Sequence, residues 1–327
     1  RASREAQNRV SEELADQVLG ALYELIKGIQ VADQASHRKL ISKYLNEHPE
    51  EVYHGLLNVL MRLIFMLYAE DRGIMPQGGL WQDNYEVHGL FERLQKENVQ
   101  HAGNMDKRYG AWGQLLTTFK VVHDGCRHPS MRMPARMGYL FDPRRYPFVS
   151  ADSDGNVPLV SDAVVLFVLK SLLVVKGEKI SYRSLNVENI GVVYETMMGF
   201  SIYQSKGSCV VLKGAEAPVA VELDELMSGA ASSRAQVLAD MTGWKPNAKA
   251  AKAIKDARNS NELRIALEDR IRKDITPTPL AAGGLTLQPG EERRRSGSHY
   301  TPRALTEPLV SKAFEPHYAR FGDKPTD

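Results

Sequence analysis

A segment that begins after Gly125 and runs to Asp154 mixes arginines with aromatic residues. Its arginines are Arg127, Arg132, Arg136, Arg144 and Arg145, and its aromatic residues are Tyr139, Phe141, Tyr146 and Phe148. Guanidinium groups contact phosphates and aromatic rings stack on bases, so this mixture is typical of nucleic-acid binding. The alternative is a loop that its aromatic residues pin to a core, with its arginines solvated or paired. The residue types alone leave both interpretations open.

Two other clusters have residue types that could do chemistry. Residues 70–72, with the sequence EDR, could supply acids beside a base, although pairing locally and capping a helix end is the more ordinary role. His123, Cys126 and His128 have the character of soft metal ligands. A structural zinc ion needs four ligands and no fourth is evident, so we expect no metal site.

Motifs for nucleotide binding and DNA cleavage are missing from the sequence. It contains no G-x-G, G-K-[ST], E-x-K, H-E-x-x-H or C-x-x-C string. These absences remove the dinucleotide loop, the Walker lysine and the usual metal-dependent nuclease motif. Taken alone, the residues describe a helical protein without an active site of its own.

The composition is that of an ordinary globular protein. The chain has 327 residues, 42 Lys+Arg against 40 Asp+Glu, 43% hydrophobic and 25% charged residues, which excludes disorder and collagen-like repeats. The small net charge argues against a uniform nucleic-acid coat but allows local basic patches. Two cysteines, Cys126 and Cys209, cannot staple a chain of this length, so we expect a reducing, cytoplasmic compartment.

The longest apolar runs fall short of the roughly 20 residues that span a bilayer. They cover residues 56–69 and 164–175. We expect both to be buried core helices and expect no membrane role. No signal peptide is evident after Arg1.

Hydrophobic periodicity predicts a mainly α-helical, bundle-like fold with one small β-hairpin. Helices are expected at 4–30, 37–46, 49–69, 86–99, 109–123, 159–176, 187–200, 232–242 and 247–272, the last with a break at 259–261. The helix that starts at Pro49 is apolar on nearly all sides and should lie at the centre of the first core, and Gly73 should cap its end in a left-handed conformation. Residues 209–213 and 218–222 should pair as the hairpin.

These elements divide the chain into five predicted parts. They are an N-terminal helical domain (1–125), an arginine- and aromatic-rich loop (126–158), a second helical block with the hairpin (159–274), an extended linker (275–298) and a last element (299–327) whose amphipathic helix begins near Pro302.

Four strings, in the same order along the chain, resemble segments of one protein family. Residues 60–76 (LMRLIFMLYAEDRGIMP) are similar to RLLFLLYAEDRGLLP, residues 138–143 (GYLFDP) to GGLFDP, and residues 189–198 (NIGVVYETMM) to LGSVYEXLL. These three segments are typical of large type IIG restriction-modification proteins and their BREX- and DISARM-like phage-defence relatives. Residues 295–302 (RSGSHYTP) resemble GSYYTP, motif X of gamma-class adenine-N6 DNA methyltransferases.

The resemblance implies that the chain is the N-terminal helical or spacer part of an S-adenosylmethionine-dependent adenine-N6 DNA methyltransferase. Motif I and the catalytic NPPY string of that family do not occur, which implies that the Rossmann-like catalytic domain would begin beyond Asp327. We therefore expect this chain alone to be inactive. The implied partners are double-stranded DNA and other subunits of a defence system.

The resemblance assigns cofactor contact to the turn that precedes the last helix. The turn consists of Gly297, Ser298, His299, Tyr300, Thr301 and Pro302. Backbone N–H groups near a helix start favour an anion, such as the methionine carboxylate of S-adenosylmethionine. The simpler alternative is that Thr301 and Pro302 only signal a helix start.

We expect DNA contact from two groups of arginines. The first group is Arg132, Arg136, Arg144 and Arg145, and the second is Arg293, Arg294 and Arg295. Each phosphate that they neutralise adds salt-dependent affinity. The second group could instead be a solvated linker run beside Glu291 and Glu292. A different interpretation of the whole chain is a non-catalytic helical module that docks a partner subunit and contacts neither DNA nor cofactor.

Overall fold

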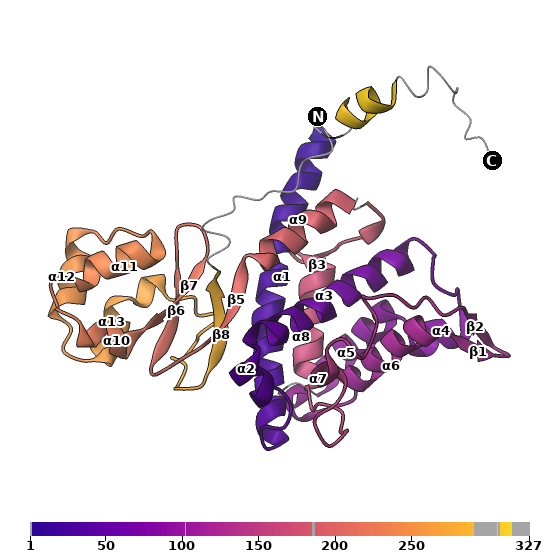
Figure 1. Ribbon diagram of the computed structural model, residues 1–327, viewed down its shortest axis with the longest axis horizontal. Helices are drawn as coiled ribbons and strands as arrows, with labels where there is room; N and C mark the ends of the chain where they lie inside the picture. Colours follow the sequence, from indigo (N-terminus) through magenta and orange to yellow (C-terminus); the bar gives the residue numbers. More distant parts are fainter. Residues whose placement is uncertain (1, 102, 185–186, 291–305, 307, 316–327) are drawn as a thin grey trace.

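The computed structural model describes residues 2–101, 103–184, 187–290, 306 and 308–315 (Figure 1). Over these residues the protein is mainly helical with small antiparallel sheets, as the hydrophobic periodicity predicts. The helices are α1 (Ala2–Ala35), α2 (Ser42–Glu47), α3 (Pro49–Asp71), α4 (Gly79–Asn84), α5 (Val87–Gln100), α6 (Ala111–Asp124), α7 (Pro147–Ser150), α8 (Asp162–Leu173), α9 (Val187–Met198), α10 (Leu223–Ser228), α11 (Arg234–Thr242), α12 (Ala248–Asp256) and α13 (Ser260–Ala266).

The strands pair in twos, always antiparallel. They are β1 (Cys126–His128) with β2 (Met131–Met133), β3 (Val174–Val175) with β4 (Glu178–Lys179), β5 (Phe200–Gln204) with β8 (Leu285–Pro289), and β6 (Cys209–Lys213) with β7 (Pro218–Glu222). The predicted hairpin at 209–222 is therefore confirmed.

The first and larger core forms around α1, α3 and α8. In Figure 1 α8 runs beside α1, and α3 crosses them. The three-and-four spacing along α1 buries one stripe, made of Leu14, Val18, Leu22, Leu25 and Ile29. Helix α3 is buried on nearly all sides, as predicted. It begins with Pro49 at its first position, and it ends where the Ile74 N–H donates to the Ala69 carbonyl, with Gly73 at φ 66°.

Helix α3 is also the helix in the described part of the chain with the length and apolar character of a membrane span. Of its most apolar window, 72% is buried inside the protein. That degree of burial is what a core helix shows.

A second, smaller core forms between the β6–β7 hairpin and helices α10 to α13, at the left of Figure 1. The hairpin separates the two cores, because successive side chains of a strand point to opposite faces. Cys209 and Val211 lie in the first core, whereas Val210 and Leu212 lie in the second. Helices α8 and α9, expected in a second helical block, instead pack against α1 in the first core.

Two segments expected to lack regular structure contain strands. The arginine-rich segment 126–158 holds the β1–β2 hairpin and the short helix α7, and the segment 275–298 expected as a linker returns to the body of the protein as β8. Strand β8 forms because it pairs with β5, which is distant in the sequence. The glycines and prolines around it indicate a loop, so its sequence alone does not predict a strand. Helix α4 was also not predicted. Of the last predicted helix, residues 308–315 are helical, while its start near Pro302 lies outside the described residues.

Candidate nucleic-acid interface

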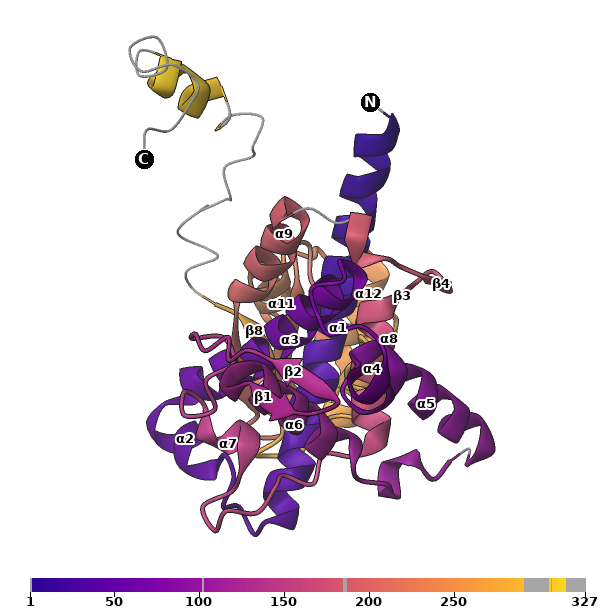
Figure 2. The same cartoon turned by 90° about the vertical axis from the view of Figure 1, so that its right-hand side faces the viewer.

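The β1–β2 hairpin carries the first two arginines of the segment. It lies at the end of the molecule that faces the viewer in Figure 2, far from α10 to α13. In the strand register Arg127 is directly opposite Arg132. Met131 and Met133 are buried, so the alternation of a strand turns the two arginines to the solvent side.

Two like charges, Arg127 and Arg132, face each other across this hairpin. Neither Arg127 nor Arg132 has an acidic partner within the part of the chain that the structure describes. Like charges directly opposite each other on paired strands destabilise a hairpin. An anion bound between the two guanidinium groups would remove that repulsion, and a phosphate has the geometry that guanidinium groups bind in a bidentate manner.

The hairpin is attached to the end of α6 by a close backbone approach at Gly125. Its φ is 77°, and a Cβ atom there would lie 2.5 Å from the Ala135 backbone nitrogen. Beyond β2, the Arg136 N–H donates to the Val122 carbonyl at 3.1 Å and the Met137 N–H to the His123 carbonyl at 3.0 Å. These contacts hold Arg136, which is exposed and unpaired among the described residues, next to the hairpin.

Arg62 of α3 fixes the following loop from inside the core. Its Nε donates to the Leu140 carbonyl at 2.7 Å and its Nη2 to the Asp142 carbonyl at 3.2 Å. The side chain is 2% exposed, and burial lowers its pKa to about 10. Phe141 between these carbonyls is buried against Phe65 and Phe119. Phe141 therefore pins the loop to the core, as the alternative interpretation of this segment predicts.

The remaining arginines of the loop differ in their surroundings. Arg144 is paired with Asp142 at 3.0 Å, and these hydrogen bonds lower the pKa of the Asp142 carboxyl to about 2. Arg145 lies 3.3 Å from the ring centre of Tyr139, a side chain that is 72% exposed. An exposed aromatic ring stacked with a guanidinium group is a surface that suits both phosphates and unstacked bases.

Three of the arginines predicted to contact DNA have no acidic partner among the described residues, whereas the fourth is paired with Asp142. Arg132, Arg136 and Arg145 lie on one continuous segment after α6, and Arg144 is neutralised locally. The other predicted residues lie outside the described residues: Arg293, Arg294 and Arg295, and the cofactor turn Gly297, Ser298, His299, Tyr300, Thr301 and Pro302. The role of Arg62 as an anchor of the loop was not predicted. In the sequence it is visible only as a charged residue within the apolar run 56–69.

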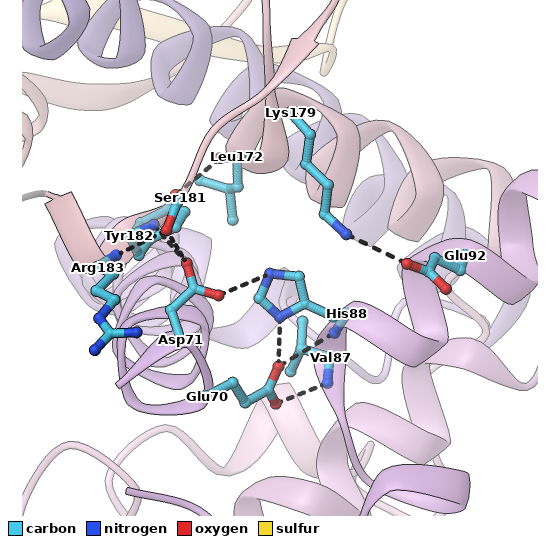
Figure 3. Close-up of polar contacts among 10 residues, drawn as sticks. All are labelled: Glu70, Asp71, Val87, His88, Glu92, Leu172, Lys179, Ser181, Tyr182 and Arg183. Carbon is cyan, nitrogen blue, oxygen red and sulfur yellow. Dashed lines mark hydrogen bonds and ion pairs between the residues drawn. The ribbon is translucent and has the colours of Figure 1, made fainter. Parts of the chain in front are cut away.

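The acidic residues at the end of α3 join three segments of the fold (Figure 3). Glu70, whose side chain is 2% exposed, accepts hydrogen bonds from the backbone N–H groups of Val87 and His88 at the start of α5. Asp71 accepts from the Tyr182 N–H at 2.6 Å and from the Ser181 hydroxyl at 3.0 Å. The prediction that these residues pair locally and cap their own helix is wrong, because their partners lie on two distant segments.

His88 lies between these two carboxylates and completes the junction. Its Nδ1 is 2.9 Å from Glu70 and its Nε2 is 3.5 Å from Asp71 (Figure 3). Arg72 turns away, donating to the Arg183 carbonyl and lying over the Tyr68 ring. All the acidic oxygens have structural partners, so the junction positions helices and offers no evident base to a substrate.

The histidines and the cysteine near the hairpin do not gather. His123 pairs with Asp124 at 2.6 Å, and His128 accepts from the Ser130 N–H. Over the described residues no group of three or more such side chains could hold a metal ion.

Comparisons with known proteins leave the family open. No family model matches the chain, and no curated protein or solved structure matches it. The resemblance therefore rests on the four strings. Two of them meet in the structure, since Arg62 of the first binds the backbone of Leu140 and Asp142 in the second.

Proposed function

We propose that this chain is the DNA-positioning, N-terminal helical part of an S-adenosylmethionine-dependent adenine-N6 DNA methyltransferase of the restriction-modification or phage-defence class. Its contribution is to hold double-stranded DNA by the phosphate backbone. The binding surface is the hairpin and the loop that follows it, with Arg127, Arg132, Arg136 and Arg145 as the phosphate contacts.

The opposed pair of Arg127 and Arg132 is the observation that carries this proposal. A solvated surface arginine is ordinary, but two of them held face to face on a short hairpin cost stability unless an anion binds there. The buried anchor at Arg62 holds the backbone of the loop at Leu140 and Asp142, which lowers the entropy that the loop loses on binding.

Cofactor binding is the second half of the proposal. It rests on the resemblance of residues 295–302 to motif X, and the catalytic motifs of the family are not in the sequence. Methyl transfer to DNA is accordingly assigned to the full assembly. Incorporation of labelled methyl groups into DNA by this chain alone would contradict the assignment.

The test of DNA binding is a salt titration with a short fluorescent duplex. The triple variant Arg127→Glu, Arg132→Glu, Arg136→Glu should lose more than about ten-fold in affinity, and its log–log salt slope should fall by about one for each lost phosphate contact. The matched control reverses Lys249, Lys252 and Lys255, exposed cations of α12 at the opposite end of the molecule.

Both triple variants change the net charge by the same amount. The difference between their DNA affinities therefore measures the contribution of the hairpin surface apart from that of the net charge. Equal losses in the two would show that the hairpin is not the interface. Absence of salt-dependent binding by the unmodified chain would favour the alternative function, a helical module that docks a partner subunit.

A further inference from the structure

A cavity of about 290 Å³ lies between β7, α10 and α11, in the second core and at the opposite end of the molecule from the arginine hairpin (Figure 1). One wall carries Tyr203, Glu222 and Gln288, and the other carries Glu225 and Arg234. Apolar side chains close the space between them. The cavity is separate from the proposed DNA surface, and its chemistry is different.

Glu222 is a buried carboxylate whose hydrogen-bond partners in the described part of the chain are neutral donors. It is 7% exposed, and its oxygens accept from the Tyr203 hydroxyl at 2.9 Å and from the backbone N–H groups of Lys206 and Gly207 at 2.8 and 3.1 Å. No basic side chain pairs with it among the described residues. A carboxylate has about four acceptor positions, so three hydrogen bonds leave room for a further donor.

The guanidinium group of Arg234, which also lines this cavity, bonds backbone carbonyls through two of its three nitrogens. The two amino groups of Arg234 donate to the carbonyls of Ala257 and Met227, at 2.9 and 3.0 Å, and its buried Nε has no partner. Glu225, also on the cavity wall, has no salt bridge within the described part of the chain. The cavity thus has two carboxylates and a single guanidinium group that neutralises neither directly.

The rest of the wall is apolar apart from Ser233. Leu226 and Met241 lie beside Val237, which is 39% exposed at the α11 side. Cavities of this kind, mostly apolar with a few convergent polar groups, are typical of small-ligand sites. A buried negative charge is stabilised by a cation with hydrogen-bond donors, and by an anion not at all.

We propose that this cavity binds a small organic cation of the amidine, guanidine or amine class, whose charged head bonds Glu222 and Glu225 and whose apolar body packs against Leu226, Val237 and Met241. The cation is either a free small molecule or the end of an arginine or lysine side chain from a polypeptide. Both sources share the same chemistry.

The test is calorimetric titration of the full chain with benzamidinium, with neutral benzamide and with anionic benzoate. Benzamidinium should bind saturably, and the other two should bind at least about ten-fold more weakly, because a charge-assisted hydrogen bond is lost. Competition by N-acetylarginine methylamide would identify a polypeptide side chain as the source, and its failure to compete would identify a free small molecule.

Variants separate binding in the cavity from binding elsewhere. Glu222 also holds the backbone at 206–207, so Glu222→Gln could disturb folding, and Glu225→Gln is the cleaner change. Glu225→Gln should weaken benzamidinium about ten-fold. Val237→Trp should block the cavity, and Asp83→Asn, an exposed acid on α4, should leave binding unchanged. Equal binding of benzamide, or unchanged binding in both cavity variants, would overturn the proposal.

Discussion

Arg62 is a charged residue in the middle of an apolar helix, and its position explains why the chain tolerates it there. Its guanidinium group passes out of α3 to the carbonyls of Leu140 and Asp142 and lies over the Phe119 ring. Those carbonyls lie in a loop, outside the strands and helices whose regular backbone hydrogen bonds would otherwise satisfy them. The arginine therefore replaces missing secondary structure, and it fixes the loop that presents Arg145 and Tyr139.

Replacement of Arg62 by methionine keeps much of the side-chain volume and removes the donors. We expect the free energy of unfolding to fall by about 2 kcal/mol, because two carbonyls lose charge-assisted hydrogen bonds. Urea unfolding measures this change, and hydrogen exchange at residues 139–146 should rise. Arg144→Met, which removes an exposed arginine, is the control and should leave stability unchanged. An unaffected loop in Arg62→Met would show that Phe141 alone holds it.

The two cysteines differ in reactivity for a physical reason. Cys209 is fully buried in β6, and burial raises the pKa of its thiol to about 12. The reactive thiolate is therefore scarce there at every pH below that value. At pH 8 iodoacetamide should modify Cys126, which is partly exposed, and leave Cys209 unmodified until the protein unfolds. Mass spectrometry of tryptic peptides distinguishes the two. Equal labelling in the native state would contradict the burial of β6.

At the scale of elements, the β1–β2 hairpin depends on one backbone position. Gly125 has a left-handed φ, and the backbone of Ala135 and Met133 lies where a Cβ would be. Gly125→Ala should lower the free energy of unfolding by more than about 1 kcal/mol. Because the hairpin must shift, the variant should also weaken DNA binding, as followed by anisotropy with the same duplex.

Gly113 provides the matched control for this substitution. It lies within α6 in an ordinary helical conformation, and no atom lies near the place of its missing Cβ. Gly113→Ala should raise the free energy of unfolding by about 0.5–1 kcal/mol, since alanine is the better helix former. If both variants lowered the stability, the left-handed conformation of Gly125 would not explain the loss at that position.

Elements with strong local signals could be predicted from the sequence. Helix α3 (Pro49–Asp71) begins at a proline followed by acids, and Gly73 lies just beyond its end. The predicted range, 49–69, is therefore close to the observed one. Strands β1 and β2 were missed because they have only three residues each, and β8 was missed because its partner β5 lies far away along the chain. Glycines and prolines flank all three strands and indicate loops.

The candidate site was only partly predictable for the same reason. Composition alone identifies the arginines and aromatic residues of 125–154, because residue type needs no partner. Which arginine is free depends on tertiary contacts: Arg144 has Asp142 two positions away, whereas Arg127 has Arg132 opposite it. The anchor at Arg62 lies about eighty positions from the loop, and no local pattern relates the two.

At the scale of the whole molecule, the two cores share the β6–β7 hairpin. Val211 and Ala220 pack into the first core, and Val210 and Val221 pack into the second. Loss of either core exposes one face of the same hairpin, and a two-stranded hairpin is marginal without packing. The cores should therefore unfold together, in contrast to a pair of domains joined by a linker.

The three tryptophans can test this cooperativity directly. Trp81 and Trp112 are buried in the first core, and Trp244 packs against the second. In a Trp244→Phe variant fluorescence reports only the first core, and in a Trp81→Phe, Trp112→Phe variant it reports only the second. If the cores are coupled, Val210→Ala should shift both urea transitions by the same amount, equivalent to about 1–3 kcal/mol. A shift confined to the Trp244 signal would show that the hairpin unfolds with the second core while the first survives without it.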